Sequence, residues 1–133
     1  MNKLYLILIS LFLLLTPSKA EDFKTVLKQI QKGFEQNNAK LFSNYFDDNC
    51  YLSLNNGISG YYTSNQAYYI FEKYFSTYKI LEFKVVESAK SNIQVIIEIA
   101  VKYVKDCNTN TGQVLITLKN YNDKFLITQI FIS

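Results

Sequence analysis

The stretch from Gly60 to Tyr78 restricts the possible folds most, because it carries both the start signal and the packing face of a helix. Thr63, followed three residues later by Gln66, is typical of a capping box, in which each side chain satisfies a backbone N–H of the first turn. Apolar and aromatic residues then recur at steps of three and four along one helical face: Ala67, Ile70, Phe71, Tyr74, Phe75 and Tyr78. Helical patterns precede this segment and strand patterns follow it, so we expect the helix to lie across a sheet.

The first twenty residues have the pattern of a secretory signal peptide. A positive charge at Lys3 precedes an apolar run from Leu4 to Leu15, and Ser18 and Ala20 are small residues suited to a cleavage site. The run is shorter than the roughly 20 apolar residues of a membrane-spanning helix. We therefore expect residues 1–20 to be removed, residues 21–133 to form one domain, and the mature protein to be exported to the periplasm or the cell exterior without a membrane span.

Charge and composition exclude several functions. Cleavage would remove two lysines and no acidic residue, which lowers the formal net charge from +3 to +1. With so little positive charge and no arginine, the chain lacks the basic surface of a nucleic-acid-binding protein. The sequence has no histidine, so it lacks the Ser-His and Cys-His nucleophile pairs and the commonest zinc ligand. No spacing of Asp, Glu or Cys is typical of a metal site, and we expect no cofactor.

Two helical patterns precede the central helix. Asp22 can cap a first helix with one apolar stripe, formed by Phe23, Val26, Leu27, Ile30 and Phe34. Gly33 lies at the edge of this stripe, which indicates close packing on a neighbour. Residues 36–38 end the helix, because asparagine tolerates the left-handed conformation. Asn38 can cap a short second helix holding Leu41, Phe42, Tyr45 and Phe46, which we expect to end in a turn at residues 47–49.

Strand patterns fill most of the remaining chain. Residues 50–54 alternate as a half-buried strand, and the Asn55-Asn56-Gly57 signal predicts a hairpin that returns through residues 58–61. After the central helix, four runs predict a meander: 79–87, 93–104, 113–119 and 124–132. We expect the first run to bury Leu81, Phe83 and Val85, the second to place Ile93 on its apolar face, and residues 106–112 to form a loop.

The order of elements is helix, helix, short hairpin, helix and meander, which predicts an α+β domain with its helices on one face of the sheet. Several motifs, taken in this order, carry a resemblance to a known fold: Asn38-Ala39, Tyr45-Phe46, Gly60-Tyr61-Tyr62-Thr63, Gln66-Ala67, Tyr74-Phe75 and the ending Leu126 to Ile132. The chain resembles the nuclear transport factor 2-like (cystatin-like) cone, in which a curved, mainly antiparallel sheet wraps N-terminal helices and one long helix. More narrowly, it is similar to a family of small exported bacterial proteins of unknown function.

The resemblance also implies a strand order in which the early hairpin borders the final strand. Cys107 would then lie at the tip between the long strand and its successor. Two strand spacings of about 4.8 Å would separate this tip from Cys50, whereas a disulfide needs Cα atoms about 4.4–6.8 Å apart. We expect Cys50 and Cys107 not to be joined.

Cones of this type often open to a pocket, and the residues suited to line it here are Tyr45, Phe71, Tyr74, Phe83 and Glu98. Glu98 beside a tyrosine could serve as the base of a small lyase or isomerase, because burial among aromatic rings raises the pKa of a carboxylate. The other interpretation is that Glu98 shares an exposed face with Gln94 and Lys102, and we favour it because this face is mixed.

The chain is rich in tyrosine, and four tyrosines cluster at the start of the central helix: Tyr61, Tyr62, Tyr68 and Tyr69. Exposed tyrosine is common in interfaces, so a protein or glycan partner, a homodimer contact and plain solvent exposure all stay open. Two functions remain. We favour a non-catalytic binding or assembly module over a lyase or isomerase with its base in the cone. A carboxylate lining the pocket would distinguish the second from the first.

Overall fold

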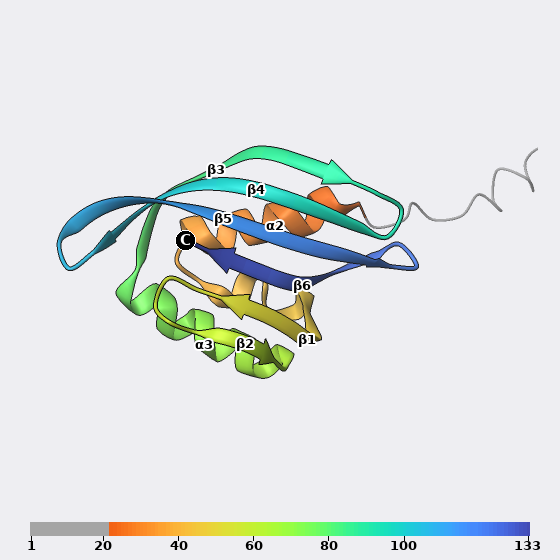
Figure 1. Cartoon of the computed structure of the whole chain (residues 1–133), viewed down its shortest axis with the longest axis horizontal. Helices are drawn as coiled ribbons and strands as arrows, with labels where there is room; N and C mark the ends of the chain where they lie inside the picture. Colours follow the sequence, from red (N-terminus) through yellow and green to blue (C-terminus); the bar gives the residue numbers. More distant parts are fainter. Residues whose placement is uncertain (1–21) are drawn as a thin grey trace, which may run out of the picture.

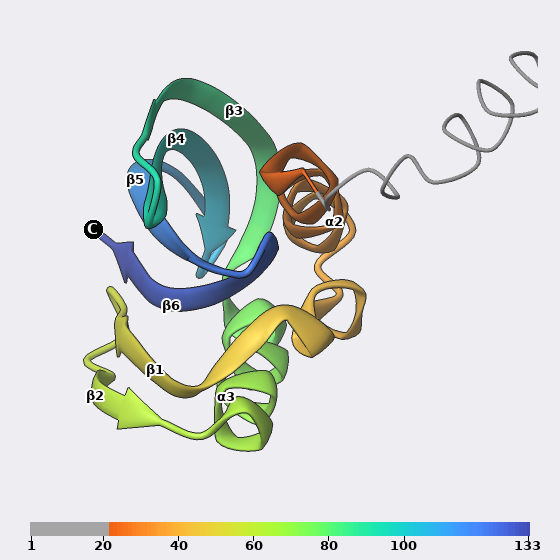
Figure 2. The same ribbon diagram turned by 90° about the vertical axis from the view of Figure 1, so that its right-hand side faces the viewer.

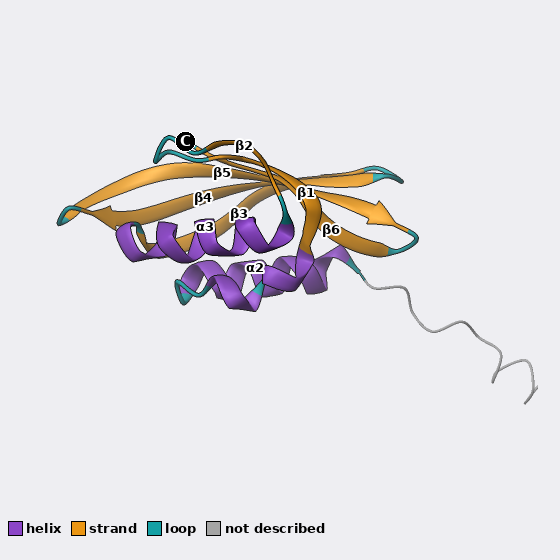
Figure 3. Ribbon diagram, turned by 90° about the horizontal axis from the view of Figure 1, so that it is seen from below, coloured by secondary structure: helices purple, strands orange, loops and turns teal. Residues whose placement is uncertain are grey.

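A computed structural model describes residues 22–133, so the predicted signal peptide lies outside the described residues. Two helices, α2 (Phe23–Glu35) and α3 (Ser64–Thr77), cover one face of a six-stranded sheet (Figures 1 and 3). The strands are β1 (Phe46–Ser53), β2 (Ser59–Tyr62), β3 (Lys79–Lys90), β4 (Gln94–Lys105), β5 (Asn108–Tyr121) and β6 (Lys124–Ile132). The predicted α+β cone is confirmed. None of the helices in the described part is long and apolar enough to cross a membrane.

The sheet has the order β2-β1-β6-β5-β4-β3. Every neighbouring pair is antiparallel except β1 and β6, which run parallel. The sheet curves strongly, with α2 packed against β3 and α3 against β1 (Figure 2). The first hairpin thus borders the last strand, as the resemblance implied. Cys50 is buried in β1, Cys107 is exposed at the β4–β5 turn, and both are free thiols.

Helix α2 begins and ends as its sequence predicts. The Asp22 side chain accepts a hydrogen bond from the Lys24 N–H, and Asn37 has the left-handed conformation (φ 51°) that ends the helix. The Asn37 side chain also accepts a hydrogen bond from the Ile80 N–H at 2.8 Å, which joins this end of α2 to β3. Gly33 packs directly against the ring of Phe42, so its close packing is confirmed.

Helix α3 carries the predicted capping box. The Gln66 N–H donates to the Thr63 hydroxyl at 3.2 Å, and the Gln66 side chain accepts from the Thr63 N–H at 3.0 Å. Four members of the predicted stripe are buried: Ala67, Phe71, Tyr74 and Phe75. The helix ends when Tyr78, itself buried, turns the chain into β3.

The predicted second helix is wrong. Residues 39–45 form two short 3₁₀ turns, η1 (Ala39–Leu41) and η2 (Ser43–Tyr45), and Phe46 already begins β1. The expected turn at residues 47–49 is therefore a strand, in which Asp47 and Asn49 face away from the core. A strand is favoured here because Phe46 pairs with Ile127 of β6, a partner far away in the sequence.

Two strand predictions also need correction. A register shift between Ile80 and Glu82 buries Ile80 and Phe83, so Leu81 is 55% exposed and Val85 is also exposed. The expected loop at 106–112 is a two-residue turn at Asp106 and Cys107, both with positive φ, after which β5 begins at once. Ile93 lies outside β4 in the preceding turn and is exposed.

Aromatic rings fill the inside of the cone. Phe34 stacks on Phe42 at 5.5 Å and meets Phe75 edge-on at 5.2 Å. The apolar faces of β4, β5 and β6 complete this core, and the only buried polar side chain among the described residues is that of Thr117. The cone interior is therefore a packed core of apolar and aromatic side chains.

Candidate functional site

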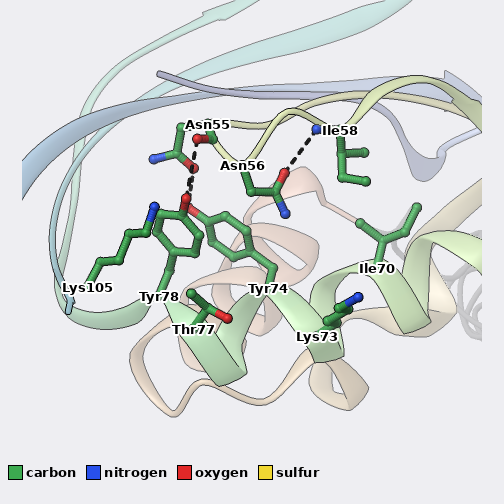
Figure 4. Close-up of a pocket in the computed structure, with 9 residues that line it drawn as sticks. All are labelled: Asn55, Asn56, Ile58, Ile70, Lys73, Tyr74, Thr77, Tyr78 and Lys105. Carbon is green, nitrogen blue, oxygen red and sulfur yellow. Dashed lines mark hydrogen bonds between the residues drawn. The ribbon is translucent and has the colours of Figure 1, made fainter.

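A groove of about 470 Å³ lies at the rim of the cone where three segments meet (Figure 4). The loop between β1 and β2 forms one wall, the C-terminal half of α3 forms the other, and the end of β4 closes one end. Nine residues line the groove: Asn55, Asn56, Ile58, Ile70, Lys73, Tyr74, Thr77, Tyr78 and Lys105.

Two stacked tyrosines form the floor of the groove. The rings of Tyr74 and Tyr78, one helical turn apart on α3, are parallel within 2° at a centroid distance of 4.4 Å. The Tyr74 hydroxyl donates to the Asn55 Oδ1 at 2.8 Å, and the Tyr78 hydroxyl donates to the Asn55 carbonyl at 3.3 Å. Asn55 in turn donates to the Tyr103 hydroxyl at 3.4 Å. This network fixes the β1–β2 loop to α3, so the groove is preformed.

The groove has an apolar end and a positively charged end. Ile58 and Ile70 lie at one end, whereas Lys105 reaches over the ring of Tyr78 with its Nζ 5.0 Å from the ring centroid at the other (Figure 4). Lys73 on α3 adds a second ammonium group. None of the described residues that line the groove is a carboxylate, so no side chain of the lining neutralises the charge of the two lysines.

The environment shifts two pKa values in this groove. Burial raises the pKa of Tyr74 well above its ordinary value, so its hydroxyl stays protonated and keeps donating to Asn55. Hydrogen bonding with the Tyr78 side chain is the main cause that raises the pKa of Lys105, which keeps this ammonium group charged. The groove therefore offers two aromatic rings held in place by hydrogen bonds and the positive charge of its lysines.

The structure separates the five residues that the sequence predicted for a pocket. Tyr74 lines the groove, but Phe71 and Phe83 are buried in the core and Tyr45 packs half-buried against it. Glu98 lies on the opposite face of the sheet, because its neighbours Ile97 and Ile99 face the core, and it accepts a hydrogen bond from Gln113. Among residues 22–133, the structure thus brings no carboxylate into the groove that Tyr74 lines.

Sequence reasoning missed most of the groove. Asn55 and Asn56 carried only a turn signal. Lys73 is a polar residue of the predicted central helix, and Lys105 directly follows the predicted strand 93–104. The available clue was Tyr74 and Tyr78 on one helical face four residues apart, but nothing local indicates that a hairpin loop and a distant strand end meet them. No cluster of three or more possible metal ligands occurs among residues 22–133.

Comparison with solved structures shows the fold. A structure from Bacteroides uniformis is 19% identical, with a TM-score of 0.71, over 80% of this chain and 94% of that chain. One from Bacteroides ovatus is 20% identical, with a TM-score of 0.69, over 78% and 90% of the two chains. Both are described as DUF4783 family proteins. A protein of unknown function from Shewanella oneidensis, described as nuclear transport factor 2-like, is 13% identical with a TM-score of 0.62, over 84% and 95%.

No curated protein matches the chain. The family model described as "Domain of unknown function (DUF4783)" matches residues 27–133, a stretch that contains both walls of the groove, both helices apart from the first turn of α2, and all six strands. The chain belongs to the DUF4783 family and has its nuclear transport factor 2-like, cystatin-like fold.

Proposed function

We propose that this protein is an exported, non-catalytic binding module whose groove takes a ligand with an apolar body and an acidic group. The observation that carries the proposal is the lining itself: two lysines, two fixed tyrosine rings and two isoleucines, with no carboxylate among the nine lining residues. Positive charge beside an aromatic floor attracts an anion, and the isoleucines bury the apolar part of the same ligand.

The alternative, a lyase or isomerase, finds less support. Acid–base chemistry at neutral pH requires a group whose pKa lies near 7 and whose atoms face the substrate. The titratable groups of the groove are tyrosines and lysines, and the shifts of Tyr74 and Lys105 move their pKa values further above neutrality. The best predicted base, Glu98, lies on the other face of the sheet. A preformed groove without a base favours binding over turnover.

A matched pair of probes tests the acidic preference. 4-Phenylbutyrate and its neutral amide share the apolar body and differ in charge, so isothermal titration of both reports the contribution of the carboxylate. We expect the acid to bind more tightly than the amide. Replacing Lys73 and Lys105 together with glutamine should weaken binding of the acid by about tenfold, because two surface charge pairs contribute up to about 1 kcal/mol each.

Lys84→Gln is the matched control, since Lys84 is exposed on β3 away from the groove. It removes one of the two positive charges that the double variant loses and should leave the affinity unchanged. Equal affinity for acid and amide, or equal weakening in the control and the double variant, would contradict an acidic ligand. Turnover of a substrate in the groove would contradict a binding role.

Export is tested separately. The pattern at residues 1–20 supports cleavage after Ala20. The intact mass of the protein recovered from the native cell envelope or medium should match a chain that begins at Glu21. A mass that retains Met1 to Ala20, or recovery from the cytoplasm alone, would show that export is wrong while leaving the groove unaffected.

A further inference from the structure

The face of the sheet that the helices leave open carries a second group of aromatic residues, none of which lines the groove. Tyr51 of β1 pairs across the strands with Tyr61 of β2, and their rings meet at 5.0 Å and 63°. On its other side, Tyr51 meets Phe131 of β6 at 5.7 Å and 56°. Tyr61 is 69% exposed and Phe131 is also exposed, so the three rings form an angled, solvent-facing row.

Polar side chains able to donate and accept hydrogen bonds surround this row. A hollow of about 380 Å³ contains Tyr51 and Tyr61 together with Asp47, Asn49, Gln129 and Lys119. Tyr121 donates to one oxygen of Asp47, and Lys119 lies 5.0 Å from the ring centroid of Tyr121. Amides and carboxylates arranged in this way satisfy hydroxyl groups, which both donate and accept.

We propose that this outer hollow, lined by Tyr51, Tyr61 and the polar residues beside them and flanked by Phe131, binds a neutral oligosaccharide. A pyranose ring presents C–H groups on its faces and hydroxyls around its edge. The C–H groups carry partial positive charge and pack on the negative faces of aromatic rings, whereas the hydroxyls need amide and carboxylate partners.

Charge in the hollow favours a neutral ligand over an acidic one. Asp47 and Lys119 have opposite charges and both line it, and Tyr121 contacts both. The outer hollow thereby differs from the groove, whose lining includes two lysines and no carboxylate. The two sites have no lining residue in common, so this proposal stands without the proposed function of the groove.

Titration of the purified protein with cellohexaose, maltohexaose and chitohexaose tests the proposal. The chain has 11 tyrosines and no tryptophan, so tyrosine fluorescence and ¹H–¹⁵N shifts report binding directly. We expect at least one of these sugars to bind with a dissociation constant below about 10 mM. The shifts should centre on residues 49–51, 61 and 129, with none in the groove.

Tyr61→Ala removes one ring of the row and should weaken sugar binding by about tenfold. Tyr69→Ala is the matched control, because Tyr69 is a 60% exposed tyrosine on α3 outside the hollow, and it should leave the affinity unchanged. The proposal would be overturned if none of the three sugars gave a response, or if the shifts centred on the groove. It would also be overturned if a second copy of the chain covered the hollow. Light scattering would then show a dimer, and Tyr61→Ala would dissociate it.

Discussion

Gly33, near the end of α2, has the ring of Phe42 packed directly against its α-carbon. A β-carbon at this position would also come within 2.9 Å of the Asn38 carbonyl oxygen. Glycine lowers the stability of a helix interior by about 1 kcal/mol relative to alanine, so helix propensity alone would favour replacing it. The contact with Phe42 explains why the small residue is needed: it lets α2 and the 3₁₀ turns approach each other.

Gly33→Ala should therefore destabilise the protein by about 1–3 kcal/mol, because the added methyl group must displace a buried ring. The free energy of unfolding in urea measures this change. Lys28→Ala, at an exposed position of the same helix, is the control and should shift it by less than about 0.5 kcal/mol. A stabilised Gly33→Ala variant would mean that helix propensity outweighs the contact with Phe42.

Cys50 makes stability depend on pH. Burial, followed by the nearby charge of Asp47, raises the pKa of its thiol from the ordinary 9.0 to about 12. The folded protein then holds this proton more tightly than the unfolded chain, so the contribution is complete below pH 9 and is lost as the pH rises towards 12. Above pH 10 Tyr74 adds to the loss, since burial raises its pKa in the same direction.

Between pH 9 and pH 10, the free energy of unfolding should fall, approaching about 1.4 kcal/mol per pH unit from this one thiol. Urea unfolding at several pH values measures the slope. Cys50→Ala should flatten it in this interval, whereas Cys107→Ala, at an exposed position, should keep it. An unchanged slope in Cys50→Ala would assign the pH dependence to another group.

At the scale of elements, the sequence predicted structure wherever the signal is local. The Thr63–Gln66 capping box, the apolar stripe of α3 and the Asn56-Gly57 hairpin turn depend on neighbouring residues and are confirmed. The wrong predictions concern segments whose structure is determined by pairing with a neighbouring strand. The bulge at Leu81 is set by the register with β4, and Phe46 extends β1 because β6 lies beside it. The groove was not predictable, because it is assembled from segments about 50 residues apart in sequence.

The N-terminus of α3 offers a test at this scale. Thr63→Ala removes the hydroxyl that accepts from the Gln66 N–H and should lower the free energy of unfolding by about 1 kcal/mol. Asn65→Ala, an exposed change in the same turn, should leave it nearly unchanged or raise it slightly through helix propensity. Thermal unfolding of both variants measures the difference. Equal stability of Thr63→Ala and the parent protein would show that the cap is dispensable for α3.

For the molecule as a whole, the packed interior of the cone is the feature that leaves candidate binding sites at the surface. Aromatic rings occupy the interior, and the rim groove and the outer hollow both lie outside this packed core. The groove is held by the hydrogen bonds of Asn55 with Tyr74, Tyr78 and Tyr103, which link α3, the β1–β2 loop and β4. The fold thus acts as a rigid frame that presents a preformed, positively charged rim to an acidic ligand.

Mapping the ¹H–¹⁵N shifts of the protein during addition of 4-phenylbutyrate is the most direct test of this view. We expect the shifts to centre on Ile58, Ile70, Thr77 and Lys105, to saturate, and to be much weaker with the neutral amide at the same concentration. Shifts of equal size with acid and amide, shifts centred outside the groove, or none at all would contradict the conclusion that this rim binds an acidic ligand.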